Sequence, residues 1–178
     1  MSSAPKLFVE QSGRMYYPLR LEEREYARAI QSLVFVCTDI GIIDVSSKMI
    51  YLARRALRPA SGWWWFIGGR SRIGETEYQS AQRCFERETG LLIAEERFNF
   101  VCMNRYFFKD RQQEPREAGC DSLCYTLSLH LTDEERARII LDPHEYLGGG
   151  LQAFDYEKLQ STEGVQDPVR DFYIKAFD

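Results

Sequence analysis

The chain has 178 residues, 44% of them hydrophobic and 13% aromatic, and it carries a formal net charge of −4. This size and composition fit a globular protein with a sizeable core and argue against disorder. The negative charge argues against general nucleic-acid binding, and no apolar run is as long as a membrane-spanning segment. The five cysteines form no CxxC pair, and the first residues lack a secretion signal, so we expect a cytoplasmic protein with reduced thiols.

Residues 1–19 are predicted to form a mobile N-terminal arm and residues 20–178 a single domain, because no repeat or linker interrupts the chain. Helical periodicity or capping signals predict helices at 21–31, 77–88, 132–140 and 155–159, with a last helix from 167 onward. Apolar, β-branched or aromatic runs predict strands at 33–43, 49–54, 63–67, 98–108 and 122–131. Strands and helices mixed in this order predict an α/β sandwich.

Glycine and capping residues set several boundaries. Gly90 is predicted to close the helix 77–88 in the left-handed conformation that only glycine adopts at low cost. Asp167 is predicted to cap the last helix, with Pro168 in its first turn. His144 and the glycine run 148–150 are predicted to lie together in a loop.

A basic stretch precedes the helix 77–88. Between Val45 and Gly74 there is no acidic residue, whereas six cations occur there: Lys48, Arg54, Arg55, Arg58, Arg70 and Arg72. Arginine favours phosphate because its planar guanidinium offers two parallel donors. A local positive field in an acidic protein indicates a small anionic ligand, and a solvated basic edge is the alternative.

A glycine pair, Gly68 and Gly69, leads toward the helix that carries Cys84 and Glu88. Those two residues are four apart and therefore share one helix face. A carboxylate there, together with a backbone carbonyl from the glycine turn, supplies hard oxygen ligands of the kind that Mg²⁺ takes. An ordinary solvated amphipathic helix is the alternative.

The spacing from residue 69 to residue 91 resembles the Nudix box. The matching positions are Gly69, Glu75, Arg83, Phe85, Glu88, Gly90 and Leu91. Two glutamates of the usual pattern are replaced, one by Cys84 and one by Arg87. The resemblance implies the Nudix fold, an α/β/α sandwich with a mixed sheet between helices. It also implies a structural role for Glu75, Arg83 and Gly90, with Glu75 pairing with Arg83.

The segment 52–70 resembles the GDP-mannose mannosyl hydrolase subfamily, whose Nudix box lacks the same two glutamates, and the likeness covers most of residues 20–160. It implies a homodimer that hydrolyses GDP-mannose or GDP-glucose at sugar C1 with one Mg²⁺ ion, or Mn²⁺ in its place. By position, Gly69 and Glu88 would be the metal ligands and His144 the general base. Asp39 would lie near the reaction. The remaining candidates, which would contact the departing diphosphate, are Arg55, Arg70 and Arg58.

The sequence departs from the subfamily directly before His144, where Pro143 replaces a glutamine that binds metal in the relatives. Two other functions therefore stay open. One is a Nudix pyrophosphatase that acts on a nucleoside diphosphate derivative at phosphorus. The other is a catalytically inactive domain that binds a nucleotide sugar. We expect no nucleic-acid or membrane partner for any of the three.

Overall fold

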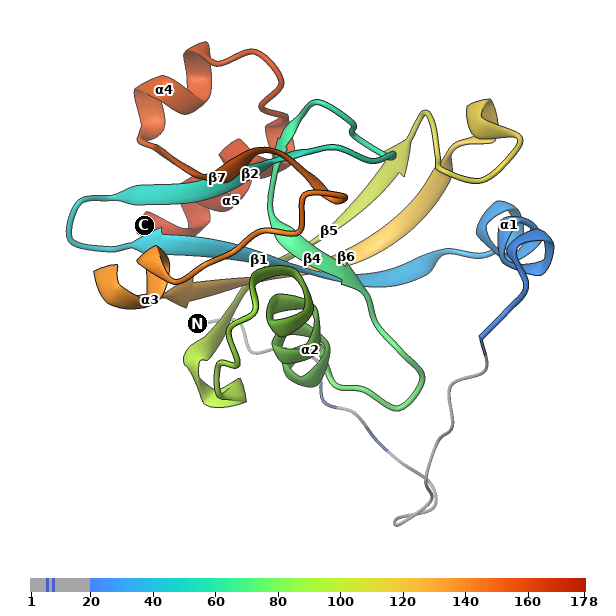
Figure 1. Ribbon diagram of the computed structural model, residues 1–178, viewed down its shortest axis with the longest axis horizontal. Coiled ribbons are helices and arrows are strands. Elements are labelled where there is room, and N and C mark those ends of the chain that lie inside the picture. Colours follow the sequence, from blue (N-terminus) through green and yellow to red (C-terminus); the bar gives the residue numbers. More distant parts are fainter. Residues whose placement is uncertain (1–5, 7, 9–19) are drawn as a thin grey trace.

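The computed structural model describes Lys6, Phe8 and residues 20–178, so the predicted N-terminal arm lies largely outside the described residues. A seven-stranded mixed sheet forms the centre (Figure 1). Its strands are β1 (Phe35–Asp44), β2 (Met49–Arg55), β3 (Trp64–Trp65), β4 (Ile67–Arg70), β5 (Phe98–Phe108), β6 (Cys120–His130) and β7 (Tyr146–Phe154). The helices are α1 (Glu23–Ser32), α2 (Glu77–Thr89), α3 (Asp133–Ala137), α4 (Tyr156–Ser161) and α5 (Asp167–Phe177), with 3₁₀ turns at Glu95–Arg97 and Arg116–Ala118.

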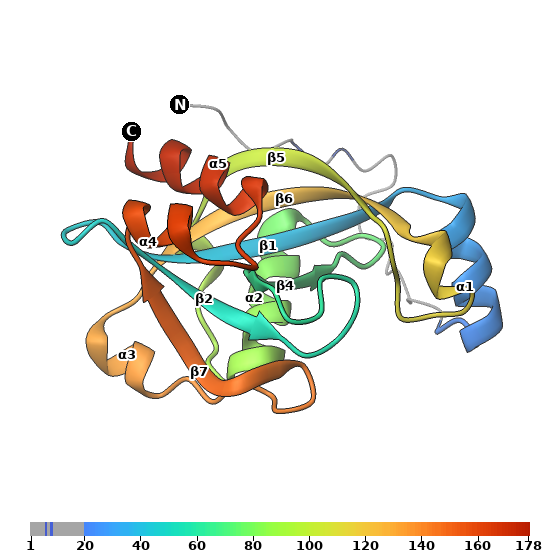
Figure 2. The ribbon, with the colours of Figure 1, turned by 90° about the horizontal axis from the view of Figure 1, so that it is seen from above.

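Helices cover both faces of the sheet, with α2 on one face and α4 and α5 on the other (Figures 1 and 2). Alternation along β1 supplies both cores, because successive side chains of a strand point to opposite faces. Ile40 and Ile42 pack with the residues of α2, whereas Ile43 packs with those of α5. Gly41 faces α5, and a Cβ on it would lie 2.3 Å from the Phe172 ring. The predicted α/β/α sandwich is confirmed.

The sheet splits along one edge of β1. β2 pairs with the end of β1 as far as Ile42–Tyr51, and β4 takes over that edge from Ile40–Ile67. The predicted continuous strand 63–67 is therefore wrong, because Phe66 separates β3, which pairs with β2, from β4, which pairs with β1. The split opens the sheet between β2 and β4.

The glycine run 148–150, predicted as a loop, lies inside β7. Leu52 pairs with Gln152 and Arg54 with Leu147, so residues 148–151 bulge opposite Ala53 alone. Gly148 and Gly149 absorb the bulge with φ values of 79° and 70°, a region that favours glycine.

Two helix boundaries also differ from the predictions. Gln166, not Asp167, is the N-cap of α5, and Asp167 is its first helical residue. The capping box at Thr132 is present, yet α3 ends at Ala137, because the chain then turns so that the Ile140 amide donates to the carbonyl of Thr89 at the end of α2 (3.2 Å). In the described part of the chain, no helix has the length and apolar character needed to cross a bilayer.

Candidate functional site

The predicted box folds into a turn, α2 and a closing glycine. Thr76 caps α2 by accepting from the Gln79 amide, and Gly90 ends it with φ 72°, the left-handed conformation expected of it. Arg83 donates to both oxygens of Glu75 (2.5 and 2.7 Å) and to the carbonyl of Arg70 (2.9 Å). The amide of Arg72 also donates to Glu75 (2.8 Å), so the expected ion pair is present and fastens the turn to the helix.

Glu88 is the buried carboxylate of α2, with 3% of its surface exposed. Its Oε2 accepts from the Gly68 amide (3.4 Å) and from the hydroxyl of Tyr146 on β7. Its Oε1 accepts from Nη2 of Arg87. Burial raises the pKa of Glu88, and these donors oppose that shift because they favour the charged form. Both oxygens of the carboxylate are therefore already engaged by the protein.

Arg87 lies against the glycine turn. A Cβ added to Gly69 would stand 3.1 Å from Nη2 of Arg87 and 3.2 Å from Sγ of Cys84. The two residues that replace glutamates of the usual pattern thus both face Gly69. One contributes a cation, and the other contributes a buried thiol whose pKa is raised by that burial.

These residues do not fit the Mg²⁺ ion that the resemblance implies. Mg²⁺ needs hard oxygen ligands, whereas a guanidinium and a thiol flank Gly69, and Glu88 already accepts hydrogen bonds on both oxygens. Throughout residues 20–178, no group of three His, Cys, Asp or Glu side chains is placed to hold a metal ion. The predicted metal ligands Gly69 and Glu88 do lie at one site, but the guanidinium of Arg87 lies against both of them.

Asp39 and Arg55 lie across the split in the sheet. Asp39, on β1, is 6% exposed, and its Oδ2 has no hydrogen-bond partner among the described residues. Burial raises the pKa of Asp39 to about 7, and the charge of Arg55 on β2 opposes the rise. Arg55 donates through Nε to the carbonyl of Pro59 (3.1 Å), and its charge also acts on Tyr146. Arg55, a cation of the basic stretch, therefore lies at the same site as two buried carboxyl groups, those of Asp39 and Glu88.

The structure sets the other predicted arginines apart from Glu88. Arg70 follows Gly69 on β4 and points to the opposite face, where its guanidinium lies 4.7 Å from the ring centres of both Tyr26 and Phe35. Arg58 pairs with Asp110 at 3.3 Å. Arg70 and Arg58 are thus each held by other side chains, and their role as substrate contacts remains a prediction.

His144 is exposed in the turn that leads into β7. Its amide donates to Oδ1 of Asp142 (2.9 Å), and its ring forms no hydrogen bond to any described residue. The following residue, Glu145, accepts from the amide of Ala56 through its carbonyl (2.8 Å), which ties this turn to the end of β2. The turn thus reaches the Arg55 end of the site, and the role of His144 as a base stays a prediction.

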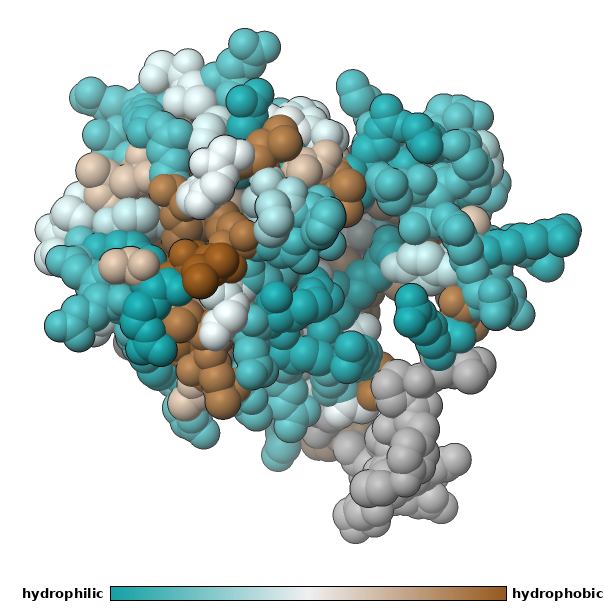
Figure 3. Space-filling model, viewed as in Figure 1, coloured by the Kyte–Doolittle hydropathy of each residue, from teal (hydrophilic) through white to brown (hydrophobic). Residues whose placement is uncertain are grey.

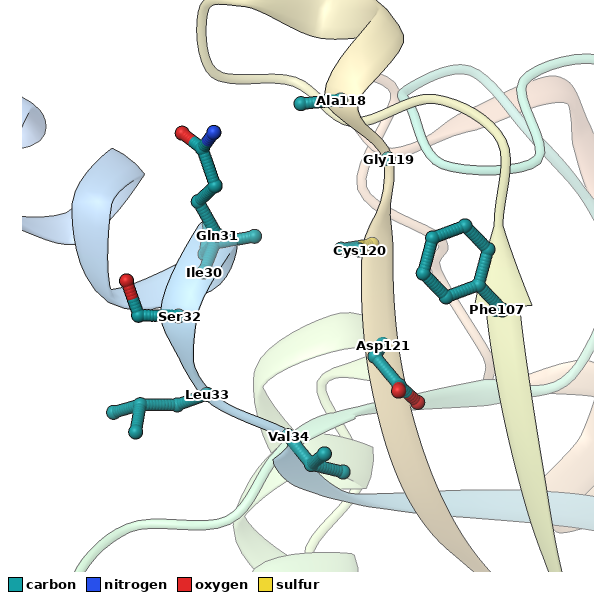
Figure 4. A pocket seen from close by; sticks show the side chains of 10 residues that line it. All are labelled: Ile30, Gln31, Ser32, Leu33, Val34, Phe107, Ala118, Gly119, Cys120 and Asp121. Carbon is teal, nitrogen blue, oxygen red and sulfur yellow. The ribbon is translucent and has the colours of Figure 1, made fainter.

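Sequence reasoning missed Tyr146, whose hydroxyl reaches Glu88 from a strand 58 residues away. No signal in the sequence marks it, because Tyr146 falls between His144 and the glycine run, in the segment that the sequence predicts as a loop. A hollow of about 190 Å³ between the end of α1 and the start of β6 contains none of the predicted site residues (Figure 4). On the face drawn in Figure 3, apolar residues gather around α3 and the chain entering β7, and polar residues cover α1.

Comparisons with known proteins agree with this arrangement. The MutT NUDIX hydrolase from Burkholderia pseudomallei matches with a TM-score of 0.64 and 16% identity, over 81% of this chain and 98% of that one. An Ap4A hydrolase from C. elegans matches with a TM-score of 0.53 and 17% identity, over 80% and 95%. Identities this low show the fold alone. The family model described as NUDIX domain matches residues 37–173, which is more than half of the chain, and the protein therefore belongs to the Nudix family.

Proposed function

We propose that the chain hydrolyses a GDP-sugar, GDP-mannose or GDP-glucose, at C1 of the sugar to give GDP and free sugar. The observation that carries this proposal is a pair of arginines, Arg87, which donates to Glu88, and Arg55, which pairs with Tyr146 across β2 and β7. Nudix hydrolases generally use divalent metal ions, and several carboxylates are needed to hold two or three of them for attack on phosphorus. This site instead presents cations, which suit the departure of a negatively charged diphosphate.

Attack at carbon needs two contributions from the protein, a base for the water and a cation for the leaving group. Water adds to C1, the bond from C1 to the diphosphate oxygen breaks with its electron pair, and the proton of the water passes to the imidazole of His144. Arg55 stabilises the charge that develops on the leaving diphosphate. Because the donors around Glu88 do not fit Mg²⁺, no step of this proposal passes through a metal ion.

A product assay in ¹⁸O-labelled water tests the proposal with a panel of nucleotide sugars. The label is expected in the free sugar, with GDP as the other product. Label in phosphate, with release of a nucleoside monophosphate, would instead establish a pyrophosphatase. Arg55→Ala is expected to lower kcat by roughly 100-fold or more, the usual cost of losing a group that stabilises transition-state charge. Arg54→Ala is the matched control, because Arg54 is the exposed neighbour on the same strand.

A second candidate function is a domain that binds a nucleotide sugar without turnover. The observation that favours it is the engagement of both Glu88 oxygens by Arg87, Tyr146 and Gly68. Calorimetry with GDP-mannose separates the two functions. Binding without any product over the whole panel of substrates, together with unchanged binding by Glu88→Gln, would establish the binding domain and end the hydrolase proposal.

A further inference from the structure

We infer that the guanidinium of Arg87 is a built-in cation that takes the place of the divalent metal ion, so that the site holds its anionic ligand without a metal. The inference concerns the cation alone and does not rest on which nucleotide sugar, if any, is hydrolysed. Its basis is the position of Arg87, the occupation of Glu88 and the charge balance of the surrounding side chains.

The position of Arg87 is the first argument. Its Nη2 is 3.1 Å from the place of a Gly69 Cβ, and the same nitrogen donates to Oε1 of Glu88. The glycine turn and the last glutamate of the box are the two groups that would have to share a metal ion. A cationic nitrogen already lies between them, and the absence of a side chain at Gly69 leaves room for it.

The occupation of Glu88 is the second argument. Tyr146 and the Gly68 amide donate to Oε2, while Arg87 donates to Oε1. A metal ion would have to reach a carboxylate that is 3% exposed and bind it beside these donors, one of which is a cation on Oε1. Those donors sit on three separate elements, α2, β4 and β7, so their arrangement is fixed by the fold rather than by one flexible loop.

Charge balance is the third argument. Glu88 and Glu145 are the carboxylates that act on Arg87, and Arg55 brings a second cation to the same site. Together with Asp39, these carboxyl groups face two guanidinium groups, which offset most of the negative charge that would attract a divalent ion. Half of the Arg87 side chain is exposed, at 52%, so the cation is both anchored by Glu88 and accessible to a ligand phosphate from solvent.

Mn²⁺ binding to the purified full-length protein, followed by electron paramagnetic resonance without substrate, tests the inference. The wild type is expected to show no saturable Mn²⁺ site. Arg87→Glu is expected to gain one, with an apparent affinity at least about tenfold above the weak, unsaturated binding of the wild type, because a carboxylate replaces the competing cation. Arg138→Glu makes the same change of charge at an exposed position in the turn after α3 and is expected to gain nothing.

Saturable Mn²⁺ binding by the wild type that is lost in Glu88→Gln would overturn the inference, since Arg87 would then yield to the ion. A folded Arg87→Glu that binds Mn²⁺ no better than Arg138→Glu would also overturn it. If Arg87→Glu does not fold, Arg87→Ala is compared with Arg138→Ala, which makes the matching change of charge. GDP titrated into the wild type with and without EDTA gives a second readout, and equal affinity is expected. A substrate panel without turnover would count against the proposed hydrolysis but leave these metal measurements intact.

Discussion

Replacement of Asp39 by asparagine is expected to change the free energy of unfolding in a pH-dependent way. Relative to the wild type, the variant should gain stability as the pH rises from 4 to 8. Asp39 is buried, its Oδ2 lacks a partner in the part of the chain that the structure describes, and burial raises its pKa from 3.8 to about 7. Arg55, Cys124 and Trp65 lower this pKa and Glu88 raises it, but burial is the largest influence. The folded protein therefore binds this proton more tightly than the unfolded chain does.

The sign and size follow from proton linkage. Below pH 3.8 the carboxyl group is protonated in both states, so it contributes no penalty. Between pH 3.8 and about 7 the folded state holds more protons, and stability falls as pH rises until the group ionises in both states. A shift of this size corresponds to about 4 kcal/mol of lost stability above pH 7, as an upper bound.

Urea unfolding of the wild type and of Asp39→Asn between pH 4 and pH 8 measures this effect. The buried amide of asparagine adds a cost that does not depend on pH, so the informative quantity is the change in the difference between the two proteins. Asp121→Asn is the control, because the hydrogen bonds from Arg105 lower the pKa of Asp121 below its ordinary value of 3.8. Its difference from the wild type should therefore stay nearly constant from pH 4 to pH 8 and change only at lower pH. A difference between wild type and Asp39→Asn that stays constant from pH 4 to pH 8 would refute the assignment of a raised pKa to Asp39.

Two further substitutions test the packing and the turn. Gly41→Ala should cost about 1–3 kcal/mol in urea unfolding, because its Cβ would lie 2.3 Å from the Phe172 ring. Gly150→Ala is the control and should change stability little, because its Cβ would meet no atom of the described residues within 4 Å. Arg83→Ala should lower the free energy of unfolding by about 1–3 kcal/mol, because Glu75 loses two hydrogen bonds while largely buried. It should also speed hydrogen exchange in the turn before α2 but not in α5. Equal exchange rates in that turn for the wild type and the variant would contradict the proposed role of Arg83 in holding it.

Much of the fold could be predicted because the signals are local. The left-handed conformation of Gly90 and the capping box at Thr132 depend on residues within one or two turns of each other, and both are present. The ion pair of Glu75 with Arg83 is present for a similar reason, since eight residues separate the partners and a single turn brings them together. Runs of apolar, β-branched or aromatic residues likewise placed the long strands close to their observed positions.

The remaining features depend on partners far apart in the sequence. Gly148 lies in a strand rather than a loop because β7 pairs with β2 and accommodates the glycines as a bulge. No property of the residues near Gly148 indicates that pairing. The break at Phe66 arises because β1 exchanges one neighbour for another along its edge. The hydroxyl of Tyr146 reaches Glu88 only after β7 has paired with β2. Periodicity could therefore indicate the elements but not the contacts between them.

The residues that match the Nudix box and the residues that depart from it have different roles in the structure. Glu75 and Arg83 hold backbone atoms of the turn, so a match at these positions reports the geometry of the turn and helix. The charge that this geometry presents to a ligand is decided at positions 84 and 87, where a thiol and a guanidinium replace two carboxylates. The same framework can thus present either a cluster of carboxylates that collects metal ions or a fixed cation. Because Arg87 is pinned by the one buried glutamate that remains, this chain presents the cation, and its chemistry has to be tested at that residue rather than inferred from membership of the family.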